Sequence, residues 1–206
     1  MILKTKLFGH VYEFKSIREV MAKANEEKSG DKLAGIAAET AEERVAAKVV
    51  LSNLTLNDLR NCPAVPYEED EVTRIIQDSV NETIFNEYKN MTVAEFREWL
   101  LDTQTTPDMI RRASRGLTSE IVAGVCKLMS NLDLIYAAKK MRVTAHCNTT
   151  IGLPGTFSSR LQPNHTTDDP NGIIASVMEG LSLGCGDAVI GLNPVDDSVE
   201  LSLIHI

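Results

Sequence analysis

Two stretches near the carboxyl end of the chain decide the fold: residues 148–164, NTTIGLPGTFSSRLQPN, and residues 186–195, GDAVIGLNPV. The second contains an apolar run over 187–192, which predicts a strand that ends at Asn193 because Pro194 cannot donate to a sheet ladder. The first is a polar loop punctuated by Gly and Pro, and one helix is expected between the two stretches. Strand, polar loop, helix and strand in this order are typical of a parallel sheet or barrel.

Polar residues that follow the expected strands form the candidate site. A strand is expected over 143–151, and the loop behind it carries one cation, Arg160, and one amide, Gln162, two positions further on. Parallel folds gather their chemistry at the carboxyl ends of their strands, so Arg160, Gln162 and Asn193 are expected on one rim. They would suit a small polar substrate. Taken by themselves, the same residues also fit a structural surface arginine and an ordinary Asn-Pro turn.

The first two-thirds of the chain carries helical signals instead. Residues 1–15 predict a short hairpin that turns at Gly9–His10. Further helices are expected near 70–80, 118–130 and 131–140. Helix starts are marked by a hydroxyl residue followed three positions later by a carboxylate, or by Thr-Pro. These start signals stand at Ser16/Glu19, Thr40/Glu43, Thr55/Asp58, Thr92/Glu95 and Thr106-Pro107.

Composition restricts the class of protein. The 206 residues include 29 acidic and 21 basic side chains, and this formal net charge of −8 argues against a nucleic-acid partner. No apolar run approaches the length of a membrane span, and the first residues do not form a signal peptide. The four cysteines are widely spaced without a C-x-x-C or a Cys/His cluster, so neither disulfides nor a zinc site is expected. This cysteine usage favours a reducing cytoplasm.

Several blocks in one order give the chain a family resemblance. Beside the two stretches quoted above, the blocks are LKTKLFG at 3–9, ERVAAK at 43–48, VTRIIQD at 72–78, GLTSE at 116–120 and DLIYAAKK at 133–140. Together they resemble the large subunit of ethanolamine ammonia-lyase, an adenosylcobalamin-dependent enzyme. The resemblance runs from the first residues to about residue 200, and the last six residues, LSLIHI, fall outside it.

The resemblance implies a fold and a reaction. The fold would be α/β, with a mainly helical N-terminal domain over 1–141 and the first βα units of a truncated TIM-type (β/α)8 barrel over 142–200. The reaction would convert ethanolamine to acetaldehyde and ammonia by radical chemistry that the cobalt cofactor supplies. The complete enzyme would assemble as an oligomer of large and small subunits in the cytoplasm, in many family members inside a bacterial microcompartment.

The resemblance also implies roles for individual residues. Arg160, Leu161, Gln162 and Asn193 match positions that contact substrate, Leu161 through its backbone. Arg160 would also be catalytic, because a guanidinium near the hydroxyl oxygen stabilises charge that develops during the reaction. Pro194 matches a position that lies against the corrin ring of the cofactor. None of the residues is expected to bind a metal ion directly.

Barrel size predicts that this sequence is a piece of a longer protein. A complete (β/α)8 barrel takes about 250 residues, whereas residues 143–206 leave room for about two or three strands. We therefore expect an amino-terminal fragment that is inactive by itself, with 201–206 as a non-native tail. A natural divergent terminus is the alternative interpretation of that tail.

Two other classes of function stay open on the residues. One is a helical interaction or assembly module without catalysis, since most of the chain is helical, and binding of cobalamin would argue against it. The other is a small α/β enzyme that acts on an unrelated polar substrate. A nucleophile paired with a general base would support that class, and the sequence offers no such pair.

Overall fold

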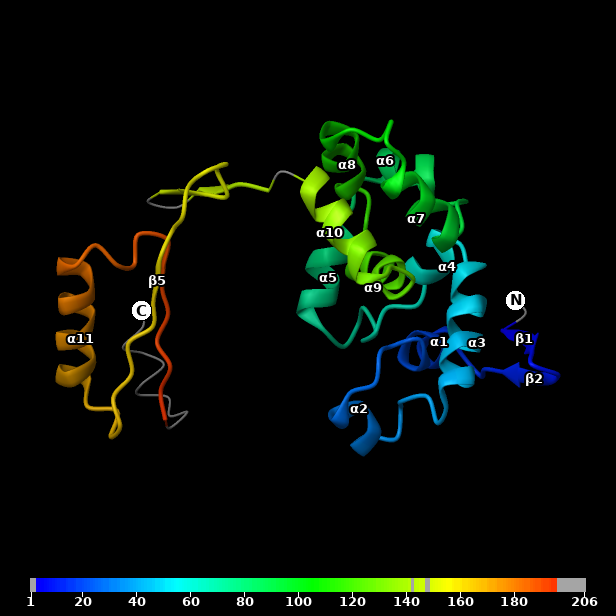
Figure 1. The fold of residues 1–206 in the computed structure, drawn as a ribbon, viewed down its shortest axis with the longest axis horizontal. Helices are drawn as coiled ribbons and strands as arrows, with labels where there is room; N and C mark the ends of the chain where they lie inside the picture. Colours follow the sequence, from blue (N-terminus) through cyan, green and yellow to red (C-terminus); the bar gives the residue numbers. More distant parts are fainter. Residues whose placement is uncertain (1–2, 142, 147–148, 196–206) are drawn as a thin grey trace. The chain divides into compact units, whose positions relative to one another are not determined.

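The contacts of the chain divide it into two compact units, unit 1 (Met1–Met141) and unit 2 (Arg142–Ile206). The structure is a computed structural model, and it describes residues 3–141, 143–146 and 149–195 (Figure 1). Both units contain helices and short strands, and helix dominates, so the chain is a helix-rich α/β protein. No helix in the described ranges is both long and apolar enough to cross a membrane.

Unit 1 opens with the predicted hairpin. Strands β1 (Lys4–Leu7) and β2 (His10–Glu13) pair antiparallel, with Leu7 opposite His10. The turn lies at Phe8 and Gly9, one residue earlier than expected, because His10 already belongs to the ladder. Both turn residues have positive φ, 52° and 81°, which is the backbone geometry that matches the twist of a two-residue hairpin.

Short helices make up the rest of unit 1. The sequence did not predict the second and the sixth of them, whereas the others begin close to the expected positions. They are α1 (Ile17–Lys23), α2 (Ser29–Leu33), α3 (Ala41–Ser52), α4 (Leu56–Arg60), α5 (Glu71–Asp78), α6 (Glu82–Tyr88), α7 (Val93–Leu101), α8 (Pro107–Ser114), α9 (Ser119–Lys127) and α10 (Asn131–Lys140).

Side-chain caps begin these helices largely as the sequence predicts. At α1, α3, α4, α7 and α8 the expected Ser or Thr accepts the backbone N–H three residues further on, at 3.1–3.3 Å. The boxes at α4 and α7 are reciprocal. Glu19 and Glu43 instead reach one residue further back, to the N–H groups of Lys15 and Glu39. Each bond to a Ser or Thr hydroxyl satisfies a donor that a helix start leaves free.

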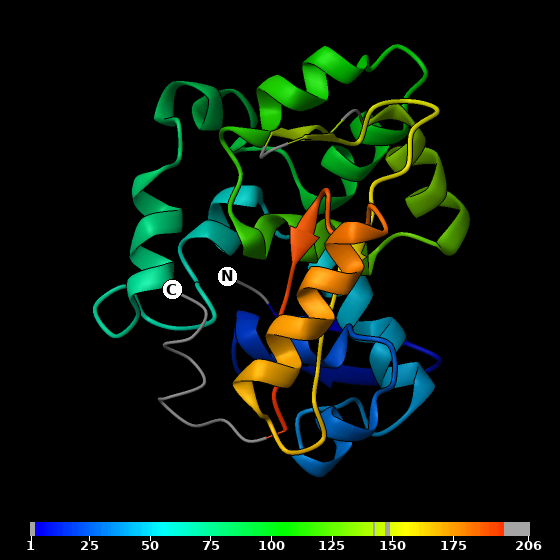
Figure 2. The same cartoon turned by 90° about the vertical axis from the view of Figure 1, so that its left-hand side faces the viewer.

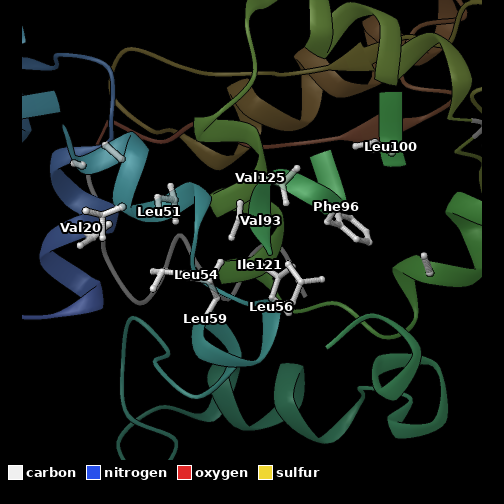
Figure 3. Packing of buried hydrophobic residues seen from close by; sticks show 14 of the residues in the cluster. Val20, Leu51, Leu54, Leu56, Leu59, Val93, Phe96, Leu100, Ile121 and Val125 are labelled. Atoms are coloured by element: carbon white, nitrogen blue, oxygen red, sulfur yellow. The ribbon is translucent and has the colours of Figure 1, made fainter. Parts of the chain in front are cut away.

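The core of unit 1 lies where these helices meet (Figure 3). Val20, Leu51, Leu56, Val93 and Ile121 are fully buried there, although they come from α1, α3, α4, α7 and α9. Burying a side chain of this size stabilises a fold by about 1.5–3 kcal/mol. Helices too short to be stable in isolation are therefore held by shared packing.

Unit 2 differs from the prediction at its first strand. The single strand expected over 143–151 is wrong, because β3 (Ala145–His146) and β4 (Thr150–Ile151) pair antiparallel as a hairpin. The chain reverses inside the expected strand. The loop expected over 152–164 contains a further strand, β5 (Arg160–Leu161).

A parallel strand pair and one helix form the rest of unit 2. Strand β5 pairs parallel with β6 (Val189–Ile190), and α11 (Pro170–Ser182) connects the two. The strand expected over 187–192 is therefore present, but it is only two residues long. The helix lies along one face of the pair (Figures 1 and 2). It packs closely because Gly180 has no side chain: a Cβ there would lie 2.6 Å from the methyl groups of Leu161. The result is a βαβ unit.

Candidate active site

The candidate site residues occupy the two strands of the parallel pair and the segments that follow them. Arg160 is the first residue of β5, Gln162 follows β5 directly, and Asn193 lies three residues beyond β6. Because the strands are parallel, with Leu161 opposite Ile190, the segments after β5 and β6 leave the pair at the same end. Gln162 and Asn193 both belong to those segments. Arg160 lies in a strand and not on a loop, which corrects the prediction from sequence.

The Arg160 side chain crosses to the neighbouring strand. A Cβ built on Gly191 would lie 2.8 Å from Nη2 and 3.2 Å from Nε of Arg160, so the guanidinium packs directly on the Gly191 backbone. The N–H of Gly191 in turn donates to the carbonyl of Leu161 at 2.9 Å. Arg160 therefore contacts the segment that leads to Asn193, two residues further along.

The polar side chains of the site are available to a ligand. Arg160, Gln162 and Asn193 are exposed, and within the described part of the chain none of their side chains forms a hydrogen bond or an ion pair. A guanidinium offers only donors, whereas each amide offers both donors and an acceptor. The set thus offers both donors and acceptors to a small polar molecule.

Two carboxylates join segments that border the strand pair. The Asp187 carboxylate accepts the N–H and the hydroxyl of Ser159 at 2.7 and 2.5 Å, immediately before β5. These hydrogen bonds lower the pKa of Asp187, the hydroxyl contributing most. The Asp168 carboxylate accepts the N–H of Val195 at 2.9 Å, which fixes the segment after β6 to the loop before α11. The sequence did not predict either role, because the partners are 28 and 27 positions apart.

The residue expected against the cofactor stands at the same end of the pair. Pro194 is half-buried, and the neighbouring Val195 is 72% exposed, so together they present apolar surface beside the amide of Asn193. Among the described residues, no group of three or more His, Cys, Asp or Glu side chains is placed to hold a metal ion.

The fold and the site define a class: an α/β protein with polar residues on the two segments that leave a parallel strand pair at the same end. The family model described as "Ethanolamine ammonia lyase large subunit (EutB)" matches residues 12–205, and the chain belongs to that family. The match includes most of the segment 201–206, which the resemblance had excluded. The resemblance read from the sequence blocks is confirmed.

Two curated relatives give the same result. The ethanolamine ammonia-lyase large subunit of Escherichia coli (strain K12) is 60% identical over 200 residues, and so is that of Salmonella typhimurium (strain LT2). Each match covers 97% of this chain and 44% of the relative. The chain therefore spans less than half the length of the curated relatives it matches.

Proposed function

We propose that this chain is part of the large subunit of a lyase that converts ethanolamine to acetaldehyde and ammonia. Membership of the family supports the reaction. The observation that carries the site is the contact between the Arg160 guanidinium and Gly191, which brings the cation of one strand to the segment that leads to Asn193. A substrate with a hydroxyl and an ammonium group two carbons apart would match the donors and acceptors that these three side chains offer.

Each residue of the proposed site has a separate task. The Arg160 guanidinium would lie near the substrate hydroxyl oxygen and stabilise negative charge that develops there as ammonia departs or migrates. Gln162 and Asn193 would orient the substrate, since an amide can accept from the ammonium and donate to the hydroxyl. Leu161 would add a backbone contact, although its carbonyl already accepts the N–H of Gly191.

Adenosylcobalamin is the cofactor we propose, and Pro194 is the residue that would contact it. The apolar surface of Pro194 and Val195 fits the face of a corrin ring, which is held by packing as well as by hydrogen bonds. When bound, the cofactor would supply the radical chemistry that removes a hydrogen atom from the substrate. The bond from Val195 to Asp168 would keep this apolar surface beside Asn193.

The βαβ unit is proposed as the first part of a TIM-type (β/α)8 barrel. Its strands need partners, because β5 and β6 pair only with each other within the described residues. Its helix needs a neighbour too: Ile174 and Met178 on α11 are 54% and 62% exposed. Further strands and helices of a longer large subunit would cover both.

Partners and location follow from the same proposal. The word "large" in the name of the relatives implies a small subunit, and we propose an oligomer of both kinds in the cytoplasm, with packaging in a bacterial microcompartment. We also propose that the 206-residue chain is inactive by itself. The exposed side chains of its candidate site cannot exclude water from a radical intermediate.

An assay of two proteins tests this proposal. The first is the 206-residue chain, and the second joins residues 1–200 to the remaining part of the Escherichia coli large subunit. Each is purified with the small subunit and assayed for acetaldehyde release from ethanolamine with adenosylcobalamin. We expect activity from the chimaera only. An inactive, folded chimaera would overturn the proposed reaction, and activity of the 206-residue chain would overturn the proposed inactivity.

Arg160→Ala in the active chimaera tests the catalytic role. If the guanidinium stabilises developing charge, kcat should fall by about two to three orders of magnitude while KM changes little. Arg111→Ala, which removes an exposed arginine of α8, is the matched control and should leave both constants unchanged. An effect of Arg160→Ala confined to KM would mean that Arg160 only binds the substrate.

A second candidate, a helical assembly module without catalysis, is favoured by one observation. Val72 and Ile75, one turn apart on α5, are each 61% exposed, and such a pair on one helix face is suited to contact another protein. Sedimentation of the 206-residue chain with the small subunit tests this role. A complex that Val72→Ser and Ile75→Ser together abolish would support it, in the absence of lyase activity from the chimaera.

A further inference from the structure

Unit 1 contains a pocket of about 840 Å3, remote in sequence from the candidate active site, and its volume lies within the range of small-molecule sites. Three lysines from different elements line it: Lys28 immediately before α2, Lys48 on α3 and Lys127 at the end of α9. Their convergence is unexpected in a chain with a net charge of −8. We name this cavity the lysine pocket.

The positive charge of the lysine pocket is only partly neutralised. Lys48 forms an ion pair with Glu26 at 2.7 Å, and Glu26 is the acidic residue of the pocket lining. Lys28 and Lys127 form no ion pair with any described carboxylate. The Lys127 ammonium donates instead to the side-chain carbonyl of Asn25, a neutral group. Two positive charges therefore face the cavity without an ion pair to a described carboxylate.

Burial and a neighbouring like charge make the position of Lys127 electrostatically unfavourable. Burial lowers its pKa, and the nearby charge of Lys28 lowers it further, while Asp31 acts in the opposite direction. An anion between Lys28 and Lys127 would remove this repulsion and replace the water that burial has taken from the ammonium. The three lysines in the lining thus favour a negatively charged ligand.

The start of α10 adds backbone donors to the same cavity. Ser130, the N-cap, and Asn131 line the pocket, and α10 is ten residues long. The first N–H groups of a helix point outward and favour anions, phosphate above all. Ser130 and Asp133 form a reciprocal capping box, which uses the N–H groups of both residues, and the Asp133 carboxylate also accepts from Arg97 at 2.6 Å. The N–H groups that can face a ligand are therefore those of Asn131 and Leu132.

An apolar wall completes the pocket. Leu128, Met129 and Leu134 contribute apolar side chains to its lining. Inorganic phosphate would fill only a small part of 840 Å3. We infer that the lysine pocket binds a phosphomonoester, with its phosphate between Lys28, Lys127 and the start of α10 and its organic part on the apolar wall. This inference does not rest on the proposed lyase activity.

Calorimetric titration of the 206-residue chain with three probes tests the inference. AMP carries both a phosphate and an organic part, whereas inorganic phosphate and adenosine each carry one of them. We expect AMP to bind at least about tenfold more tightly than either, because it alone satisfies both sides of the pocket. Equal binding of AMP and adenosine, equal binding of AMP and phosphate, or no binding of AMP would each overturn the inference.

Substitutions locate the site. Lys28→Met and Lys127→Met should each weaken AMP binding about tenfold, since each removes one charge-assisted contact. Lys139→Met, at the opposite end of α10 on an exposed residue, is the matched control and should change nothing. An equal effect of all three would mean nonspecific attraction and would overturn the site.

A measurement on the unsubstituted chain tests the same inference without depending on whether the variants fold. The ammonium groups are acetylated with a limiting reagent and quantified by mass spectrometry, with and without AMP. Saturating AMP should protect Lys28 and Lys127 severalfold while Lys139 reacts as before. Unchanged reaction at Lys28 and Lys127 would overturn the inference whatever the variants do.

Discussion

Gly116 sets how closely α6 and α8 approach, and a single methyl group there should destabilise unit 1. Gly116 is buried two residues after α8, and a Cβ built on it would lie 2.7 Å from the backbone nitrogen of Phe85 and 3.1 Å from the backbone carbon of Ile84. Both atoms belong to the backbone of α6. Neither can rotate away, so Gly116→Ala requires α6 to move relative to α8.

The cost of that movement can be bounded from its neighbours. The adjacent bond from the N–H of Asn81 to the carbonyl of Arg115, at 2.8 Å, also joins α6 to the end of α8 and would be strained. Phe85 is 3% exposed, so a shift of α6 would disturb the core as well. Forcing extra atoms into a packed core costs about 1–3 kcal/mol, and we expect a loss of about 2 kcal/mol.

Urea unfolding followed by circular dichroism measures this loss. With a slope of about 2 kcal/mol per molar urea, the midpoint should fall by about 1 M. Gly30→Ala is the matched control: Gly30 lies within α2, a Cβ there meets nothing within 4 Å, and removing a helical glycine should stabilise by about 0.5–1 kcal/mol. A midpoint for Gly116→Ala at or above that of the unsubstituted chain would refute the close approach of α6 and α8.

Two further substitutions test other parts of the chain. Hydrogen bonds from the Ser130 N–H and from Arg97 lower the pKa of Asp133 in the folded chain. The ionised carboxylate therefore stabilises the fold at any pH above its pKa in the unfolded chain, and this stabilisation is lost as the pH falls through its lower pKa in the folded chain. Asp133→Asn should therefore lower the melting temperature at neutral pH, and its difference in melting temperature from the unsubstituted chain should narrow below about pH 4. A difference that stays constant across this range would contradict a stabilising role of the ionised Asp133 carboxylate. Gly191→Ala in the active chimaera should displace the Arg160 guanidinium and reduce kcat by about ten- to a hundredfold, as steady-state kinetics can measure. An unchanged kcat would mean that the packing of Arg160 on Gly191 has no part in the reaction.

Helix starts were predictable because their chemistry is local. The bond from the N–H of Glu95 to the hydroxyl oxygen of Thr92 joins residues three positions apart, so both partners are close together in the sequence. The second helix was not predicted because its N-cap residue, Lys28, forms no side-chain hydrogen bond to the helix. The sixth was missed although Asn81 does cap it, at 3.1 Å. Its start directly behind α5 depends on the long-range bond from Asn81 to Arg115.

Short strands were harder to predict for the opposite reason. A two-residue strand has no hydrophobic period, and its existence depends on a partner that the local sequence does not reveal. β5 is such a strand, since Arg160 and Leu161 pair with residues that follow a whole intervening helix. The prediction of one strand over 143–151 was wrong for a different reason. The apolar and polar residues of this range suit a strand, but the chain reverses within it, so that Ala145 pairs with Ile151.

The arrangement at Arg160 combines a predictable part with one that the sequence could not reveal. Gln162 and Asn193 could be assigned to the same end because each follows a strand, and the parallel pairing of Leu161 with Ile190 makes those ends coincide. The position of the guanidinium depends instead on the absence of a Cβ atom at residue 191. Arg160 can lie on the backbone of residue 191 only because that residue is glycine, and any side chain there would compete for the same space. Gly191 is thus a positioning residue of the proposed site, since its effect on the reaction would act entirely through Arg160.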